Sequence, residues 1–520
     1  MIPRAALATA ACAALLLTGC GGGGGTTTSF TGPDPASLTP ADAPLFAEAV
    51  VRPEGDQKDA LDSALSKLLA TDDPGGFIVE RLDRVLGEQA KGFTYEHDVA
   101  PWLGSRAAIF FETFTNDAEG AAVLAVTNPA AARDAIDKAS AASGKRQRHA
   151  TYHGVGYDIS GSTATGLVGD FLVTGSEGAF KDAVDASQGT SLADSSDFAA
   201  QLAAAPDDQV AFLYASPQGI VDALEKSGEL TADELRAAGP QVQSLLSQPA
   251  TASVSATADN VSLELSAAQG PNTSAPHESP LLSDFPSDSW LAFASSDAGA
   301  ALGQGLGAAE QALGFDLGAQ LSHWAGDIGG FARGTSLFGL GGALVLETSD
   351  EQASAQTLDD LKRTLSADRS LQISPLSTPG EQGFSLSPAG VPIQVQFVQR
   401  DGKVVVGLGS ESVDQVFSPS STLGDSDAFK AAESSLGDDF PPVAFLDFVP
   451  LLQLIEGFQQ VAQDPGYQQA KPYLDHLASL AVGGRSEGSR AFVRIVLGLR
   501  DAPSTTDTSQ GANSPAVLVP

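Results

Sequence analysis

Hydrophobic and polar positions alternate along several short stretches of this 520-residue chain. Alternation predicts β-strands, because successive side chains of a strand point to opposite faces of the sheet. The clearest predicted strands are 107–111, 166–174, 393–398 and 403–406.

Other stretches repeat their apolar positions with the helical period of 3.6 residues. Residues 56–70 and 77–89 both fit an amphipathic helix. Asn128 and Pro129 precede 130–142 as a capping residue and a first-turn proline, so a helix is predicted there. Ser176 and Ser410 are predicted to cap helices in the same way.

The predicted strands often follow one another without a helix between them, which favours antiparallel sheets. The predicted fold class is therefore α+β, with two tandem, internally duplicated halves of mainly antiparallel sheet and packed helices. We expect the halves at 38–268 and 281–500, joined by a polar, Pro-rich linker at 269–280. Residues 501–520 are rich in Ser and Thr and are predicted to be a disordered tail.

Short matches between the halves carry the duplication prediction. The segment 40–45 resembles 286–291, Trp102 with its following residues resembles Trp324, and 210–213 resembles 443–446. The matches keep their order along the chain. Each half closes with an alternating hairpin, and we expect each hairpin to form the sheet edge of its own half; the apolar positions are Val261, Leu263, Leu265, Val493, Ile495 and Leu497.

The N-terminus has the layout of a signal peptide. Arg4 precedes an apolar run at 5–17, and Leu17-Thr18-Gly19-Cys20 follows directly. This pattern resembles the lipobox of bacterial lipoproteins. The resemblance implies a signal peptide at 1–19 and a diacylglycerol on Cys20, which would anchor the protein on the extracytoplasmic face of the cell membrane. A Gly/Thr-rich tether is expected at 20–37.

Together with the lipobox, the Pro40-Ala41-Asp42 opening, the segment 98–104 and the duplicated layout resemble the bacterial domain-of-unknown-function family 3352. The likeness covers roughly 38–500. It implies a secreted or lipid-anchored envelope protein. It brings no activity and no catalytic residue with it.

Charge and cysteine content narrow the function further. The sequence has 64 acidic and 28 basic residues, and removal of 1–19 would leave a net charge of −37. Such a field repels nucleic acid, so a nucleic-acid partner is not expected. The two cysteines, Cys12 and Cys20, both lie at the N-terminus, so no disulfide is expected in the mature chain.

Motifs for catalysis or for cofactor binding are missing from the sequence. His149 and His153 are four residues apart, but their neighbours favour a turn and a strand over a metal site. The glycine-rich stretch 303–307 lies in a helical pattern, whereas phosphate loops follow a strand. No catalytic residue, metal or cofactor is therefore predicted.

Trp102 and Trp324 are the most prominent repeated side chains, and they are the candidate ligand platform. Packing at a helix-to-strand corner is the simpler interpretation. Three functional hypotheses are open for the whole chain. The first is a noncatalytic binding or structural module that contacts an unknown protein or wall component. The alternative is a carrier of lipid or of another hydrophobic ligand, and the third is an enzyme whose site forms from residues scattered between the halves.

Overall fold

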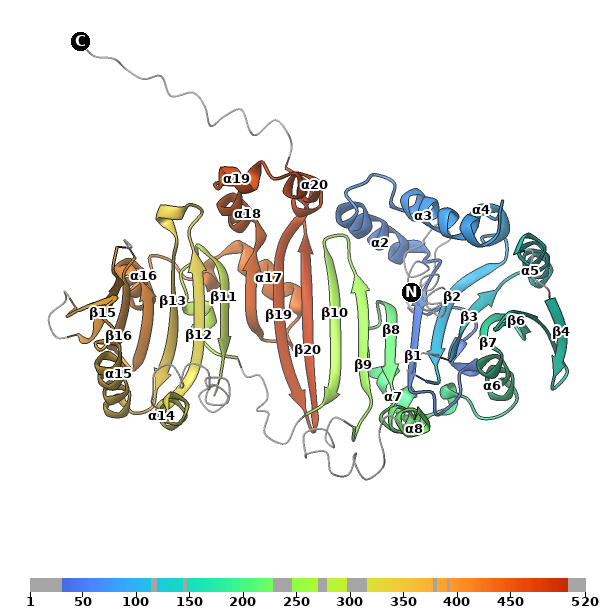
Figure 1. The fold of residues 1–520 in the computed structure, drawn as a ribbon, viewed down its shortest axis with the longest axis horizontal. Helices are drawn as coiled ribbons and strands as arrows, with labels where there is room; N and C mark the ends of the chain where they lie inside the picture. Colours follow the sequence, from blue (N-terminus) through green and yellow to red (C-terminus); the bar gives the residue numbers. More distant parts are fainter. Residues whose placement is uncertain are drawn as a thin grey trace, which may run out of the picture.

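A computed structural model describes residues 30–113, 119–143, 147–227, 246–269, 278–296, 316–376, 381–390 and 393–503. The predicted signal peptide, Cys20, the glycine-rich stretch 303–307 and most of the tail lie outside these residues. Within them, all strands join one antiparallel sheet of 20 strands (Figure 1). The structure confirms the α+β class.

The first half supplies ten strands, which are β1 (Leu45–Val50), β2 (Leu103–Phe111), β3 (Gly120–Val126), β4 (Gln147–Tyr152), β5 (Val155–Ser160), β6 (Thr163–Val168), β7 (Phe171–Ser176), β8 (Gln209–Ala215), β9 (Ala250–Ala256) and β10 (Asn260–Ala268). The second half supplies β11 (Ser289–Ser295), β12 (Ala325–Arg333), β13 (Gly341–Thr348), β14 (Leu371–Ser374), β15 (Gln382–Pro388), β16 (Val395–Arg400), β17 (Lys403–Leu408), β18 (Pro442–Asp447), β19 (Leu477–Glu487) and β20 (Arg490–Leu499).

The two halves arrange their strands in the same order. Across the sheet the first half reads β4, β5, β6, β7, β3, β2, β1, β8, β9, β10. The second half reads β14, β15, β16, β17, β13, β12, β11, β18, β19, β20. This is the layout that the internal sequence matches predict; its origin by gene duplication stays a prediction.

The closing strands of the two halves pair with each other. β10 and β20 run antiparallel from Asn260 opposite Gly498 to Ala268 opposite Arg490. The expectation that each closing hairpin forms a sheet edge is therefore wrong, because the outermost strands are β4 and β14. Since equivalent strands meet in opposite directions, the two halves are turned by about half a rotation relative to each other (Figure 1).

Helices of the first half are η1 (Pro35–Leu38), α2 (Gly55–Leu68), α3 (Pro74–Gln89), α4 (Tyr95–Asp98), α5 (Pro129–Ser143), α6 (Glu177–Gln188), η2 (Leu192–Asp194), α7 (Ser196–Ala204) and α8 (Pro217–Ser227). Those of the second half are α11 (Leu281–Asp284), α14 (Leu317–Trp324), η3 (Leu337–Gly339), α15 (Glu351–Leu365), α16 (Gly409–Phe417), η4 (Leu423–Asp425), α17 (Asp427–Leu436), α18 (Phe448–Glu456), α19 (Gln459–Ala462) and α20 (Pro465–Leu474).

Two large apolar cores lie on the same face of the sheet, which we call the covered face. In the first half, Phe180 of α6 packs there against Tyr157, and Phe198 of α7 packs against Phe46 and Phe212. In the second half, α16 and α17 pack in the same way, with Phe429 of α17 against Phe445. We call the other side of the sheet the open face.

Several predicted elements are confirmed, and others are wrong in detail. The helices predicted at 56–70, 77–89 and 130–142 correspond to α2, α3 and α5. The strand predicted at 166–174 is instead a hairpin of β6 and β7, because Gly169 adopts a positive φ of 57° in the turn. Ser176 does cap α6, whereas Ser410 lies inside α16 and caps nothing.

Candidate functional site

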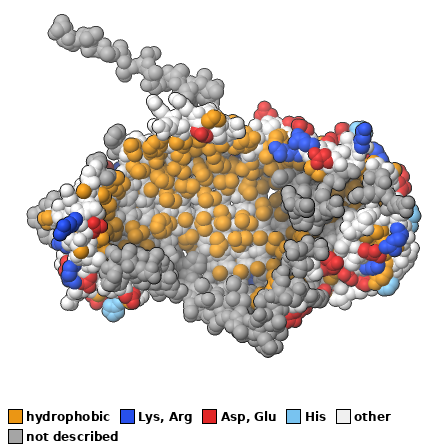
Figure 2. Space-filling model, in the orientation of Figure 1, with side chains coloured by type: hydrophobic (Ala, Val, Ile, Leu, Met, Phe, Trp, Pro, Cys, Tyr) orange, Lys and Arg blue, Asp and Glu red, His pale blue; other side chains and the backbone are white. Residues whose placement is uncertain are grey.

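The open face is apolar across the middle of the sheet. Figure 2 shows hydrophobic side chains over most of the central strands, with charged side chains gathered toward the two ends of the molecule. Successive side chains of a strand point to opposite faces. Each central strand therefore directs one set of side chains to the covered face and a second, apolar set to the open face. We call this set the apolar floor; it consists of Leu291, Phe293, Ala444, Leu446, Leu480, Val482, Val493, Ile495, Leu497, Val261, Leu263, Leu265, Ala252, Val254, Ala211 and Leu213.

Side chains of the floor remain partly exposed in the described structure. Leu265, Leu291 and Phe293 expose 38%, 36% and 40% of their surface, and every other floor residue is of intermediate exposure. Their neighbours on adjacent strands cover their flanks, as at Leu263, which lies between Val254 and Ile495. The tops of these side chains are therefore what faces outward.

At the junction of the two halves, where β10 pairs with β20, the covered face is polar and the open face is apolar. There, the covered face carries Glu264, whose carboxylate accepts hydrogen bonds from Arg494 at 2.6 and 3.1 Å. The next pair along the strands joins Arg490 to Ser266. An antiparallel sheet with one polar and one apolar face normally packs the apolar face against a core. Here the apolar face of the junction is the one left open.

Helices stand at both ends of the floor. In the first half, α2, α3, α4 and α5 pack over β2 and β3 on the open face, around Trp102. In the second half, α14 and α15 pack over β12 and β13, around Trp324. A helix with its side chains is about 10 Å in diameter. The floor therefore lies between two groups of helices, which we call its walls, and we call the floor with its walls the trough.

The two tryptophans belong to these walls. Trp102 and Trp324 expose 5% and 2% of their surface. The Trp102 indole N–H donates to the Asp98 carbonyl at 2.6 Å, and that of Trp324 donates to the Thr357 hydroxyl at 3.0 Å. Neither indole offers a face on which a ligand could stack, and core packing accounts for both.

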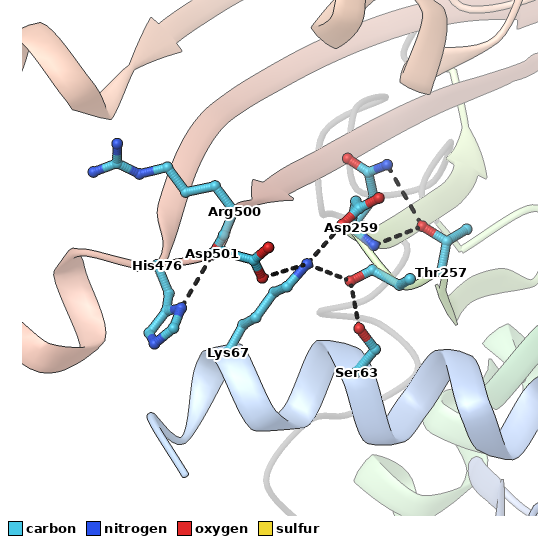
Figure 3. A network of polar contacts seen from close by, with 9 residues as sticks. Ser63, Lys67, Thr257, Asp259, His476, Arg500 and Asp501 are labelled. Carbon is cyan, nitrogen blue, oxygen red and sulfur yellow. Dashed lines mark hydrogen bonds and ion pairs between the residues drawn. The ribbon is translucent and has the colours of Figure 1, made fainter. Parts of the chain in front are cut away.

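A polar network closes the floor at the end of β20 (Figure 3). Lys67 of α2 is buried, and its Nζ lies 2.6 Å from the Asp259 carboxylate and 3.1 Å from the Ala258 carbonyl oxygen. The Asp501 carboxylate lies 3.8 Å from the same nitrogen. Because Asp501 lies two residues after the end of β20, this network ties a helix of the first half to the end of the second half.

An acidic cleft of about 510 Å³ lies away from the floor, between the start of β1, α6 and α8. Burial, a hydrogen bond with Asp182 and the nearby charges of Asp182, Glu119 and Asp42 together raise the pKa of Glu112 to about 8. The Glu112 carboxyl is therefore largely protonated at neutral pH. Sequence patterns do not reveal this cluster, because its members come from segments far apart along the chain.

The histidines considered in the sequence lie near single carboxylates. His149 is on β4 and its ring contacts Asp158, while His153 follows in the turn, with Nδ1 3.1 Å from Asp185. Among the described residues, no group of three or more His, Cys, Asp or Glu side chains has an arrangement that would hold a metal ion. None of the helices in that part of the chain has both the length and the apolar character of a bilayer span.

Comparison with known proteins gives a family and no function. The family model described as "Protein of unknown function (DUF3352)" matches residues 79–492. No curated protein sequence matches the chain. Solved structures of TP0453 align with about half of it: crystal form I at 11% identity over 47% of this chain and 81% of that one, and form IV at 14% over 46% and 82%, each with a TM-score of 0.25. At that TM-score the likeness carries no argument.

Proposed function

Because the chain belongs to the DUF3352 family of proteins of unknown function, we propose its function from the trough: a noncatalytic, lipid-anchored envelope protein that holds hydrocarbon chains on the apolar floor. This is the hydrophobic-ligand alternative drawn from the sequence. A binding module for another protein is the competing hypothesis.

The reversed polarity at the junction of β10 and β20 carries this proposal. Val261, Leu263 and Leu265 face the same side as the three apolar residues of β20, while Glu264 faces the other. Apolar surface in water is unfavourable by about 25 cal/mol per Å². A sheet that puts its charges on the covered face and its leucines on the open face is built for an apolar occupant.

The size of the floor fits acyl chains. Its seven strands, at about 4.8 Å spacing, span roughly 30 Å, and three alternating residues with their side chains extend roughly 15 Å along a strand. One acyl chain fills about half of a hydrocarbon core that is about 30 Å thick, which is also roughly 15 Å. Several chains can therefore lie side by side along the strands.

Other occupants fit less well. The floor strands are hydrogen-bonded on both sides, so an extended peptide cannot pair with them. Two sheets that pack face to face lie about 10 Å apart. In a pair of copies, the helical walls, each about 10 Å high, would stand between the two floors and keep them from packing at that distance. The net charge of −36 also repels a second copy.

The experiment that tests the proposal is recovery of the full chain from its native membrane, followed by extraction and mass spectrometry of bound lipid. We expect diacyl lipid in at least equimolar amount after the covalent anchor is counted separately. The Leu263→Asp variant, prepared in the same way, should lack it. Wild-type protein that arrives without lipid, or with a stoichiometric protein partner on the floor, would contradict the proposal.

The anchor is a separate part of the proposal and has its own test. We expect mass spectrometry of the mature N-terminal peptide to show a diacylglycerol on Cys20, and Cys20→Ala to release the protein from the membrane fraction. An unmodified Cys20 in membrane-bound protein would refute lipidation. It would leave the proposal for the floor untouched.

A further inference from the structure

Large apolar side chains are exposed on two segments of the second half, 334–343 and 448–463, which we call the tips. The connection between β12 and β13 exposes Leu337 by 61% and Leu340 by 39%. The turn between α18 and α19 exposes Phe458 by 40% and its neighbour Val461 by 41%. These four are among the most exposed large hydrophobic residues of the described chain, and they lie off the floor.

Both tips lie on one edge of the sheet. β12 ends at Arg333 opposite Ser289, and β18 ends at Asp447 opposite Ser479, so both strands finish at the edge where β20 ends. Figure 1 shows the β12–β13 connection and α18–α20 together at its top. β11 separates β12 from β18, so the strands that lead into the two tips are about 10 Å apart at the usual strand spacing.

The tips lack charge, although the chain carries 92 charged residues. Residues 334–343 contain none, and 448–463 contain Glu456 alone. The Glu456 carboxylate lies 2.5 Å from Lys471 Nζ and accepts a hydrogen bond from the Tyr467 hydroxyl at 3.0 Å. An acidic surface would be repelled by anionic lipid, and the low charge of these two segments reduces that repulsion.

The equivalent segments of the first half provide an internal comparison. Its connection between β2 and β3 contains Glu112, Asp117 and Glu119, where the second half has no charge. The sixteen residues from 217 contain four charged residues, where the sixteen from 448 contain one. The same fold can therefore carry charge at these places. The near absence of charge in these two segments is therefore particular to the second half.

Aromatic residues accompany the tips. Trp290 lies at the base of the β12–β13 connection, and its indole N–H donates to the Gly334 carbonyl at 3.1 Å. Tyr473 of α20 is 46% exposed. Tryptophan and tyrosine are enriched where proteins meet the headgroup level of a bilayer.

The first residues that the structure describes lie at the same edge. The Ser105 hydroxyl donates to the Thr31 carbonyl. Ser105 precedes Arg106, which lies opposite Val50 at the end of β1, and α2 follows β1 from this edge. Phe30 lies ten positions after Cys20, and ten residue steps span at most about 35 Å. An anchor at Cys20 and the two tips can therefore meet one membrane.

From these observations we propose that the two apolar tips of the second half, 334–343 and 448–463, rest on the lipid bilayer. They orient the sheet edge-on to the membrane, and the trough then meets lipid at its edge. The inference goes beyond the binding of hydrocarbon and stands without it.

The test places an environment-sensitive fluorophore on the tips of the full chain in phosphatidylcholine vesicles. Phe458→Cys, labelled with a nitrobenzoxadiazole maleimide, should shift its emission to shorter wavelength. It should also lose most of that emission when the lipid carries a nitroxide on its acyl chain. Ser162→Cys, exposed in the turn between β5 and β6, is the matched control and should stay in water. Unsubstituted protein, treated in parallel, corrects for label on Cys12 and Cys20.

Three results would overturn the inference. They are a label at position 458 that reports water on vesicle-bound protein, equal quenching at 458 and 162, and failure of the protein to cosediment with vesicles. Leu263→Asp in the labelled chain separates this inference from the proposed function. We expect that variant to lose bound hydrocarbon and keep the quenching at 458. Bound hydrocarbon with an unquenched label would remove the membrane contact alone.

Discussion

Replacing Leu263 with aspartate puts a carboxylate in the middle of the apolar floor. Leu263 lies on β10, the strand of the first half that pairs with β20 of the second half. Its neighbours across the strands are Val254 of β9 and Ile495 of β20. If the face is open, the new carboxylate stays in water. The folded protein then loses two cross-strand apolar contacts, each about 0.2 to 1 kcal/mol, so unfolding should become easier by at most about 2 kcal/mol.

Binding of hydrocarbon should suffer much more than folding. An occupant that covers position 263 must strip water from an unpaired carboxylate, which costs several kcal/mol. Taking about 3 kcal/mol for this penalty, the Kd for a hydrocarbon ligand rises roughly 100-fold. The prediction is therefore a variant that folds and does not bind.

Titration with N-phenyl-1-naphthylamine, a neutral dye that brightens in apolar surroundings, measures the affinity, and urea unfolding measures stability. Asn260→Asp is the matched control, because it adds the same charge to the same strand on the opposite face. It should leave the dye Kd unchanged. If Leu263→Asp binds the dye like the wild type, the floor is not the binding surface. If it lowers the free energy of unfolding by 4 kcal/mol or more, an amount typical of an uncompensated buried charge, the face is not open.

Three further predictions concern the surroundings of the floor. Lys67→Ala should lower the free energy of unfolding by about 1 to 3 kcal/mol, because it removes a buried charged donor, whereas Arg84→Ala, which breaks a pair exposed by 60% and 75%, should change it by less than about 0.5 kcal/mol in the same urea titration. The folded-state pKa of Glu112 is raised from 4.5 to about 8, so the free energy of unfolding should fall as the pH rises from about 4.5 through 8. Glu112→Gln should flatten this dependence between pH 6 and 8.5. An unchanged slope would show that the carboxyl is not buried as described. Trp324→Ala should cost about 3 to 5 kcal/mol in urea unfolding, and a loss below 1 kcal/mol would contradict its packing in the wall.

Local structure was largely predictable from the sequence, because helix caps and alternation are local signals. Ser176 and the Asn128-Pro129 pair mark helix starts that the structure confirms. The hairpin at Gly169 was missed, although a Gly-Asp pair between two apolar runs is a turn signal. Ser410 failed as a cap because α16 begins one residue earlier, at Gly409.

The candidate site was only half predictable. Alternation at Val493, Ile495 and Leu497 showed that β20 has one apolar face, but the same alternation fits a strand packed on a core and a strand left open. Strand partners decide between the two, and the pairing of β10 with β20 joins residues more than 220 positions apart. The position of the Glu264–Arg494 pair on the covered face shows that the apolar side chains of β10 and β20 are on the open face, and the sequence alone does not show this.

The asymmetry between the halves also needed both sequence and structure. The segments 334–343 and 112–119 occupy equivalent connections, and their charges differ in the sequence alone. Only the antiparallel junction shows that the two connections point to opposite edges of the sheet. One edge of the molecule therefore carries the apolar tips, and the other carries the acidic connection.

Photolabelling can show whether an acyl chain lies on the apolar floor. A phosphatidylcholine with a diazirine near the end of one acyl chain is incubated with the full chain and irradiated, and the labelled peptides are identified by mass spectrometry. We expect labels on floor residues of β10 and β20, between 261 and 265 and between 493 and 497, and their loss in Leu263→Asp. Labels confined to the covered face, or none on these strands in wild-type protein, would refute hydrocarbon binding on the floor.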